Sequence, residues 1–511
     1  MGCGVLRSFV VHILVSVVSV FSAEAVVTYE EFGAVGDGKK DDFAAIVEAH
    51  RCANERGEPV RAKDGATYYI GGAAQTAVIR TDVDFGTARF IIDDTEVENR
   101  NTSVFSVPSD LSAFPVEGIG SLARGQTNLG VRLPMACLVR IENDRVRQYI
   151  RSGANANDGA PQQEVLVVKP NGDIDGHTPV LQPYAAVTRA MAYPIDAKPL
   201  VIRGGVFRTI ANREQENLSY FGRGISVRRS RTRIEGLRHE VTGEGTLLSP
   251  YGGFVSISLC AGVRVKDSFF SSRLNACRAG TYDITVSSAV SVSFVNCREL
   301  TDICDRKRWG VIGTNYSRNL LFDGCEFSRF DAHCGVANAT VRNSRLGHMG
   351  IEAIGYGTFL IENTTVYGNN FVSLRGDYGS TWDGDVVIRN CTFVPACGQS
   401  RAGVLVGGRN DGRHDYGYVC RMPRRIVVEG LKVDDSNHPA NYAGPWIFSD
   451  FNPARTGKTY SEPYPYHIPE EVVLKDIMTA SGERFRLSPN EYMFKDVRVV
   501  RQGMRRWKPP K

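Results

Sequence analysis

The stretch Ile388-Arg389-Asn390-Cys391-Thr392-Phe393 decides the fold, because its pattern recurs along the chain. Apolar and polar residues alternate on both sides of a central Asn, Gly or Asp, and a small residue follows this centre. Alternation with a period of two is typical of β-strands, and Asn and Gly tolerate the left-handed backbone that a one-residue bend requires. Each copy therefore predicts two short strands that meet at a bend.

The copies are spaced as in a solenoid. Successive leading apolar residues lie 32, 31, 29, 28, 19, 20, 27 and 40 residues apart: Ile202, Ile234, Val265, Phe294, Phe322, Val341, Ile361, Ile388 and Val428. Repeats of 20–50 residues indicate stacked coils that bury one continuous core. We predict an all-β fold, a right-handed parallel β-helix whose core spans residues 195–440. A β-sandwich is the alternative, but it needs hairpin turns every 8–12 residues, and these are scarce here.

Cysteines occupy the small position of three copies. Cys297, Cys325 and Cys391 stand where other copies have Ser268, Ser344 and Thr364. Free cysteine packs as a small apolar residue, and the spacings fit neither a zinc site nor a short disulfide scaffold. We expect these thiols to be buried and reduced.

Composition excludes several classes of protein. Hydrophobic residues make up 42% of the 511 residues and charged residues 23%, which rules out a mainly disordered chain. Lys and Arg total 61 against 56 Asp and Glu, a net charge of +5 that does not indicate nucleic-acid binding. The 52 glycines fit many tight turns.

The first residues predict export. Arg7 precedes an apolar run from Phe9 to Phe21, and Ala23-Glu24-Ala25 has the small residues of a cleavage site. We interpret residues 1–25 as a secretory signal, because the run is too short for a membrane anchor. The mature protein is expected to be secreted, periplasmic or extracellular, with no membrane association after signal removal.

Three further segments complete the organisation. Residues 26–106 are predicted to form an N-terminal cap and the first coils, and residues 107–194 an inserted β segment in which the repeat lapses. Within it, Asn171-Gly-Asp-Ile-Asp-Gly176 reads as a turn, with a calcium loop as the alternative. Residues 441–511 are aromatic and Pro-rich, with rings that either stack on sugars or cover the open end of the solenoid: Tyr442, Trp446, Tyr460, Tyr464 and Tyr466.

One stretch near the N-terminus resembles a known family. Its sequence is Phe32-Gly-Ala-Val-Gly-Asp-Gly-Lys-Lys-Asp-Asp-Phe-Ala-Ala-Ile46. This stretch resembles the opening of the pectate lyase superfamily, in its rhamnogalacturonase/epimerase-like branch, which is related to glycoside hydrolase family 28. The resemblance implies a strand, a Gly-rich turn and a helix that caps the first coil, and a polysaccharide as substrate. The residues agree, since Asp41 or Asp42 can cap a helix that ends near Gly57. The reaction stays open, because this fold hosts hydrolases, lyases, epimerases and adhesins.

Polar residues are concentrated between positions 302 and 385, and the in–out alternation of β-strands predicts which way their side chains point. Apolar Phe330, Ala332 and Cys334 face inward, which turns Asp331 and His333 outward; the same logic turns out Glu352 and Ser373. We expect one column of His333, Glu352 and Ser373 or Arg375, with Asp331 on the neighbouring diagonal. The predicted catalytic residues are Asp331, Glu352 and His333, and the predicted substrate-binding residues are Asp305, Arg308, His348, Arg375 and Asp377.

The predicted reaction is glycoside hydrolysis of an acidic or pectin-like polysaccharide. A glycosidase pairs a protonated carboxyl with an ionised carboxylate. Like charge would raise the pKa of Glu352 to make it the acid, and Asp331 would be the base, at a diagonal separation that favours inversion. Gly347-His348-Met349-Gly350 faintly resembles one family-28 polygalacturonase motif, whereas the other motifs are absent around this cluster.

Two other functions remain open. A polysaccharide lyase would use Arg375 or a histidine as base, with calcium or Arg308 neutralising a uronate. A carbohydrate-binding adhesin would use the same residues without catalysis. We expect no metal and no cofactor for a hydrolase, with calcium only for a lyase. The expected partner is a polysaccharide or oligosaccharide and not nucleic acid, and the oligomeric state is left open.

Overall fold

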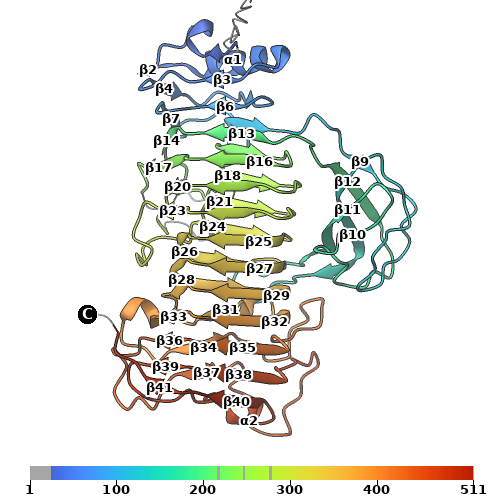
Figure 1. Ribbon diagram of the computed structural model, residues 1–511, viewed down its shortest axis with the longest axis vertical. Coiled ribbons are helices and arrows are strands. Elements are labelled where there is room, and N and C mark those ends of the chain that lie inside the picture. The colour runs from blue at the N-terminus through green and yellow to red at the C-terminus, as the bar shows by residue number, and fades with distance from the viewer. Residues whose placement is uncertain (1–24, 216–218, 246–247, 276–278, 510–511) are drawn as a thin grey trace, which may run out of the picture.

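The computed structural model describes residues 25–215, 219–245, 248–275 and 279–509, and it has the predicted right-handed parallel β-helix. Figure 1 shows the coils stacked along one axis, from helix α1 (Phe43–Arg56) at one end to β40 (Arg498–Gln502) and α2 (Glu491–Phe494) at the other. The predicted signal segment lies outside the described residues except for its last position. Within the described residues no helix is both long and apolar enough to cross a membrane.

Sheet A is the longest face of the solenoid and contains 14 parallel strands in the described residues. Its members are β1 (Val27–Thr28), β3 (Val60–Arg61), β6 (Val83–Asp84), β13 (Leu200–Arg203), β16 (Thr232–Glu235), β19 (Arg264–Lys266), β22 (Ser293–Val295), β25 (Arg318–Asp323), β27 (Val336–Arg342), β29 (Gly355–Glu362), β32 (Trp382–Arg389), β35 (Arg425–Glu429), β38 (Glu471–Lys475) and β40.

Sheet B follows sheet A across the Asn or Gly bend. It contains β2 (Asp37–Asp41), β4 (Thr67–Ile70), β7 (Arg89–Asp93), β14 (Val206–Ile210), β17 (Arg238–Thr242), β20 (Phe269–Phe270), β23 (Arg298–Glu299), β26 (Glu326–Asp331), β28 (Arg345–Ala353), β30 (Thr365–Val366), β33 (Thr392–Phe393), β36 (Lys432–Val433), β39 (Met478–Thr479) and β41 (Arg505–Arg506).

Sheet C forms the third face. Its first strands are β5 (Ala77–Val78), β8 (Phe105–Val107), β15 (Ile225–Val227), β18 (Gly252–Ser258), β21 (Tyr282–Ser287) and β24 (Ile312–Asn315). The end of β28 pairs with β31 (Val372–Leu374), and β34 (Val404–Gly407) and β37 (Trp446–Phe448) extend that branch. Short 3-10 turns η1 (Glu30–Phe32), η2 (Gly376–Tyr378) and η3 (Pro395–Gly398) lie between strands.

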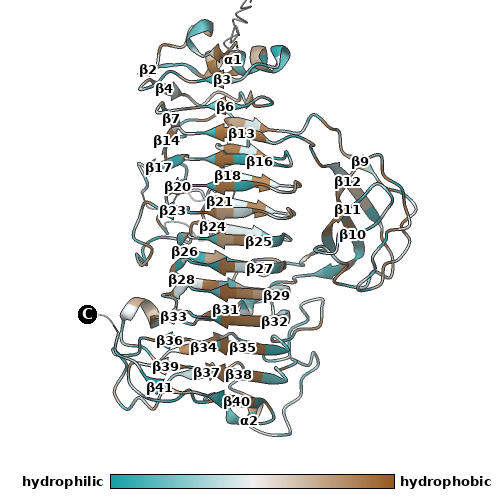
Figure 2. Cartoon of the chain, in the orientation of Figure 1, coloured by the Kyte–Doolittle hydropathy of each residue, from teal (hydrophilic) through white to brown (hydrophobic). Residues whose placement is uncertain are grey.

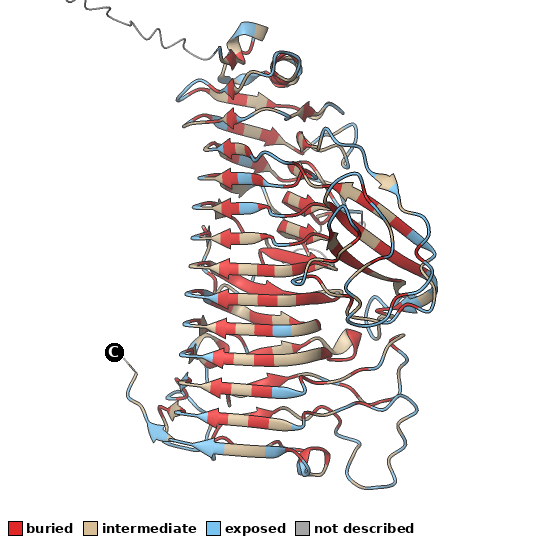
Figure 3. Cartoon of the chain, turned by 45° about the vertical axis from the view of Figure 1, so that its right-hand side comes forward, coloured by how far each residue is buried: buried red, intermediate tan, exposed pale blue. Residues whose placement is uncertain are grey.

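The predicted repeat is confirmed position by position in sheet A. All nine leading apolar residues, from Ile202 to Val428, pair in one continuous register down the sheet. They are fully buried, and the bends have the predicted left-handed conformation, with φ of 50° at Asn390 and 68° at Gly324. Figure 2 shows hydrophobic residues along the stacked strands, and Figure 3 shows buried residues alternating with less buried ones.

The small position after the bend is also confirmed. Cys297, Cys325 and Cys391 are free, with at most 2% exposed surface, and Ser268, Ser344 and Thr364 are buried too. Burial raises the pKa of the Cys391 thiol to about 12. The prediction that cysteines serve packing is nevertheless incomplete, because Cys304 and Cys397 form a disulfide between two loops that are 93 residues apart in sequence.

The predicted capping helix is α1, which ends at Gly57 in the left-handed conformation. Asp42 stands at its N-cap position, but its carboxylate accepts hydrogen bonds from the backbone N–H groups of Val35 and Gly36. The Asp41 carboxylate instead accepts from the N–H of Phe43. Both aspartates therefore fix the Gly-rich turn to the start of the helix.

A separate antiparallel sheet projects from the flank of the solenoid between β8 and β13 (Figure 1). Its strands are β9 (Phe114–Pro115), β10 (Cys137–Gln148), β11 (Ala160–Val168) and β12 (Arg189–Pro194). The Asn171–Gly176 segment is a turn after β11, where the Asn128 and Asn171 side chains donate to Asp173. This insertion has its own core and contacts the solenoid along the turns that join sheets C and A.

The aromatic C-terminal rings divide between the two predicted roles. Tyr466 is buried in the main core and covers the solenoid, and Trp446 stacks on the Arg486 guanidinium at 4.0 Å. Tyr442 and Tyr460 donate hydrogen bonds to Asp435 and to the Asp411 carbonyl. Tyr464 is 46% exposed and remains accessible to a ligand.

Candidate active site

Asp331 points away from the solenoid core, as predicted, but it is not accessible. Its neighbours Phe330 and Ala332 belong to the main core, and Asp331 itself has 0% exposed surface. Its carboxylate accepts from the backbone N–H of Thr314 at 3.1 Å and pairs with Arg329 and Arg375, each at 3.3 Å. The expectation of a solvent-facing base at Asp331 is wrong, because these groups enclose it.

The predicted register around Asp331 is wrong as well. Asp331 pairs directly with Glu352, and Glu352 with Ser373, whereas His333 lies outside this column. The shift arises in β28, which has two more residues than β26 between the Leu346 and Gly350 pairings. Directly paired strands are ~4.8 Å apart, so the diagonal separation that favoured an inverting mechanism no longer applies.

Arg375 connects the two aspartates of the site. It follows β31, and its guanidinium pairs with Asp331 on one side and donates to both carboxylate oxygens of Asp377 at 3.2 and 2.8 Å. Arg151, from the insertion, pairs with Asp377 at 2.9 Å. Burial acts to raise the pKa of Asp377, but Arg375 and Arg151 outweigh it and lower that pKa. Asp377 is therefore ionised and, at 23% side-chain exposure, reaches solvent.

The pKa of Glu352 is shifted in the opposite direction. Burial raises its pKa to about 7, against the opposing charges of Arg375 and Arg329, while Asp331 and Asp377 add to the rise. The predicted rise in pKa is thus present, but burial rather than like charge is its main cause. At neutral pH Glu352 is therefore about half protonated, whereas Asp377 is ionised.

His333 is a neutral member of the same group. Burial, and then the charge of Arg375, lower its pKa to about 4. Its Nδ1 donates to Asn315 Oδ1 and its Nε2 accepts from the Tyr378 hydroxyl, both at 3.1 Å. One donor and one acceptor suit a neutral imidazole.

A charged cavity of about 480 Å³ opens beside Asp377. Its lining combines the insertion with the turn after β31 and the loop after β34, and includes Arg151, Asp377, Arg409, Asp411, His414 and Tyr416. Arg409 is exposed, and within the described part of the chain no carboxylate pairs with its guanidinium. This cavity can admit a sugar residue and offers cationic groups to an acidic one.

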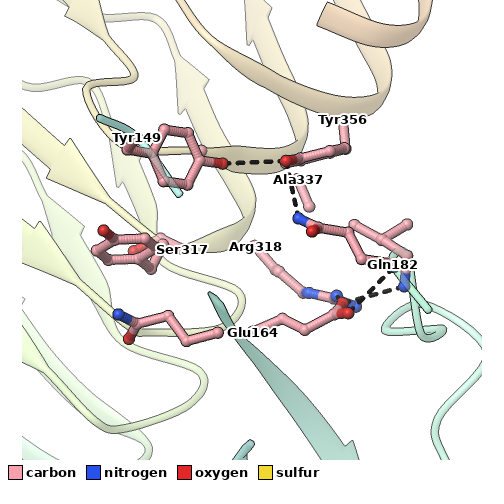
Figure 4. Close-up of a pocket in the computed structure, with 11 residues that line it drawn as sticks. Tyr149, Glu164, Gln182, Ser317, Arg318, Ala337 and Tyr356 are labelled. Atoms are coloured by element: carbon pink, nitrogen blue, oxygen red, sulfur yellow. Dashed lines mark hydrogen bonds and ion pairs between the residues drawn. The ribbon is translucent and has the colours of Figure 1, made fainter. Parts of the chain in front are cut away.

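The insertion is fastened to the solenoid around a separate small pocket, which Figure 4 shows. Glu164 of β11 and Arg318 of β25 form a buried ion pair. The Tyr356 hydroxyl of β29 accepts from Tyr149 at 3.2 Å and from Gln182 at 2.8 Å. Because Tyr149 lies two residues before Arg151, these contacts hold Arg151 over Asp377.

Three predicted substrate-binding residues lie elsewhere. Asp305 and Arg308 pair with each other at 3.3 Å, and Arg308 also lies 3.8 Å from Glu244. His348 bonds the Ile303 carbonyl, and a Cβ on Gly347 would lie 1.9 Å from that same oxygen. Packing of the loop therefore accounts for the Gly347-His348 pair, and the described contacts do not connect these residues to the Asp331–Asp377 group.

Sequence reasoning missed several members of the site. Arg329 precedes Asp331 by two residues on the same strand, so alternation alone places both on one face. Arg151, Arg409 and His414 come from the insertion and from a loop, where no repeat assigns a direction. Only the fold brings them together.

A second constellation has the order of a catalytic triad but lies inside the solenoid. Thr209 bonds His239 Nε2 at 2.9 Å, and Asp283 bonds His239 Nδ1 at 2.8 Å. All three side chains are buried, and the imidazole stacks on Phe254. No substrate reaches these atoms, so they form a structural network.

Comparison of sequences finds a depolymerase. No model of a known protein family matches this chain. The capsule KL64-specific depolymerase of Klebsiella phage P510 is 27% identical over 157 residues, and the match covers 27% of this chain and 15% of the depolymerase.

Comparison of structures finds phage tailspikes. The gp61 tailspike of Pseudomonas phage phi297 has a TM-score of 0.51 at 13% identity, covering 88% of this chain and 80% of that one. The gp54 tailspike of Acinetobacter baumannii bacteriophage AP22, solved in complex with a capsular saccharide, has a TM-score of 0.52 at 11% identity, covering 93% and 79%. The chain therefore shares the fold of these two phage tailspikes.

Proposed function

We propose that this protein is a polysaccharide-cleaving enzyme, and specifically a glycoside hydrolase in which Glu352 is the general acid. One observation carries the proposal: the Arg375 guanidinium acts on both Glu352, whose pKa is about 7, and the ionised Asp377, and Asp377 lines an open cavity. Hydrolysis of a glycosidic bond needs this pair of protonation states. Asp377 takes the role of base or nucleophile that sequence reasoning gave to Asp331, and Asp331 holds Arg375 in place.

The proposed substrate is an acidic polysaccharide outside the cell, of the kind found in bacterial capsules. The exposed Arg409 and the partly exposed Arg151 supply positive charge for a uronate or similar group. The names of the depolymerase and of the saccharide-bound tailspike support a capsular polysaccharide, and the predicted signal and the Cys304–Cys397 disulfide support an oxidising compartment. The pectin-like substrate of the sequence resemblance is the less favoured choice.

β-Elimination on a uronic acid is the second candidate, and His333 favours it. The imidazole is neutral at physiological pH, and its Nε2 accepts the C5 proton once the Tyr378 hydroxyl no longer donates to it. The C4–O bond then breaks, the departing oxygen takes a proton from water, and Arg375 or Arg151 neutralises the substrate carboxylate. Calcium could assist such a reaction, but none of the steps assigned to these residues requires it.

The test incubates the purified protein with a panel of acidic bacterial capsules, pectate and alginate. Hydrolysis yields new reducing ends without ultraviolet absorbance, whereas elimination yields both reducing ends and an unsaturated, absorbing sugar. We expect reducing ends alone, abolished by Glu352→Gln and by Asp377→Asn but retained in Asp305→Asn. Absorbing products that depend on His333 would establish the lyase, and binding without any product would establish an adhesin.

A further inference from the structure

A second cavity, of about 340 Å³, adjoins the charged cavity. The two share Asn410, His414 and Tyr416, so they lie side by side, and we call the pair the cleft. We call the second one the apolar cavity, because Val419, Pro463, Tyr464 and Pro465 line it. Both volumes fall within the ~300–1,000 Å³ that is usual for small-ligand sites.

The apolar cavity contains side chains that the folded chain itself does not cover. Six large apolar or aromatic side chains are exposed in the described residues, and two of them, Val419 at 58% and Tyr464 at 46%, line this one cavity. Scattered exposed apolar residues need no explanation, but two that converge in a cleft indicate a ligand-binding surface.

The backbone that carries the exposed ring is held in a fixed place. Pro463 and Pro465 flank Tyr464 and restrict its backbone, and the Tyr464 N–H donates to the Gly412 carbonyl at 2.9 Å. The Tyr416 ring at the junction is buried, and its hydroxyl donates to the Gly376 carbonyl. Rings that are already ordered lose little entropy when a ligand stacks on them.

Charge differs sharply between the two parts of the cleft. Arg151 and Arg409 line the charged cavity together with Asp377 and Asp411, and Arg409 is the arginine there without a carboxylate partner among the described ion pairs, whereas neither Arg nor Lys is among the described residues that line the apolar cavity. Its one carboxylate, Asp415, is exposed. An anionic sugar is therefore favoured in the first part and disfavoured in the second.

We propose that the apolar cavity binds the sugar next to the anionic one, and that this neighbour is uncharged and carries a methyl group, either of an acetyl substituent or of a 6-deoxy sugar. The methyl group and the C–H face of the ring pack against Val419 and Tyr464. The inference rests on the proposed function, since the charged cavity must hold the anionic sugar. The substrate class is thus an alternating polysaccharide rather than a homopolymer of uronic acid.

The test uses saturation-transfer NMR with three probes in the Glu352→Gln background, so that none is cleaved. They are a hyaluronan tetrasaccharide, which alternates glucuronate with N-acetylglucosamine, tetragalacturonate, and chitotetraose. We expect the acetyl methyl protons of the alternating probe to receive the strongest saturation. Tyr464→Ala should weaken its binding about three- to tenfold and leave tetragalacturonate binding unchanged, because only the stacked sugar loses a contact.

The matched control is Leu111→Ala, which truncates an exposed apolar side chain outside the cleft and should change nothing. Absence of methyl saturation with all probes, or an equal loss of tetragalacturonate binding in Tyr464→Ala, overturns the inference. Methyl contacts that depend on Tyr464 in a protein that cleaves no polysaccharide would instead overturn the proposed function and leave this sugar site standing. Cleavage whose KM is unchanged in Tyr464→Ala would overturn the sugar site and leave the proposed function standing.

Discussion

Replacing Glu352 with Gln should stabilise the protein at high pH and leave it unchanged at low pH. Burial raises the pKa of this carboxyl from its ordinary 4.5 to about 7, so the folded protein binds the proton more tightly than the unfolded chain. The stability that this proton contributes is complete below pH ~4.5 and is lost as the pH rises to about 7. Above that, wild type carries a buried charge that the amide lacks.

The size of the effect follows from the shift. One pKa unit corresponds to about 1.4 kcal/mol, so the variant gains up to about 3 kcal/mol over wild type at high pH. An unfolding entropy of about 2 cal/mol/K per residue gives roughly 1 kcal/mol/K for a chain of this length. The variant should therefore melt about 3 °C above wild type near pH ~8.5 and at the same temperature near pH ~4.

The assay compares melting temperatures of wild type, Glu352→Gln and a matched control across this pH range. Glu117→Gln serves as the control, because Glu117 is exposed and far from any described ion pair. Its curve should follow wild type throughout. A Glu352→Gln curve that also follows wild type, or that falls below it at high pH, would mean that folding does not raise the pKa of Glu352, so that this carboxyl is already ionised at neutral pH. It could then not act as the acid.

Three further predictions concern the rate, the disulfide and the loop beside it. Cleavage should slow as the pH rises through about 7, because Glu352 loses the proton it must donate, and initial rates across pH on the cleaved polysaccharide check this. Replacing Cys304 and Cys397 with Ser removes a cross-link between residues 93 apart in sequence. The free energy of unfolding should fall by about 4 kcal/mol and the melting temperature by about 4 °C. An unchanged melting temperature would show that the loops do not need the bond. Gly347→Ala should lower the melting temperature, since its Cβ would lie 1.9 Å from the Ile303 carbonyl oxygen, and loss of activity with full stability would restore a catalytic role for this motif.

Sheet A could be predicted in detail because each coil repeats one local rule. An apolar residue, a bend and a small residue recur, and in a parallel stack like residues must meet, so the columns from Ile202 to Val428 follow from sequence alone. The rule fails at β28, where two additional residues beside Gly347 change the register of the rest of that strand against β26. Composition does not reveal an insertion of that size inside a strand.

The candidate site was predicted in part, for a related reason. Asp331, His333, Glu352, Arg375 and Asp377 come from consecutive coils, so stacking alone brings them together. Their exposure could not be predicted, because what encloses Asp331 is a pair of long arginine side chains whose direction depends on their partners. The Cys304–Cys397 disulfide could not be predicted either, because it joins two loops that lie outside the repeat.

The insertion explains why the chemistry lies at one level of a solenoid whose coils are otherwise alike. Arg151 reaches Asp377 from the insertion, at a point fixed by the Tyr149–Tyr356 hydrogen bond and the buried Glu164–Arg318 pair. Arg151 adds a second cation to Asp377, which keeps that carboxylate ionised despite its burial, whereas for Glu352 burial outweighs the charges of Arg375 and Arg329 and raises the pKa to about 7. Two carboxyls that the repeat would treat alike thus acquire pKa values shifted in opposite directions, and a glycosidase needs this difference.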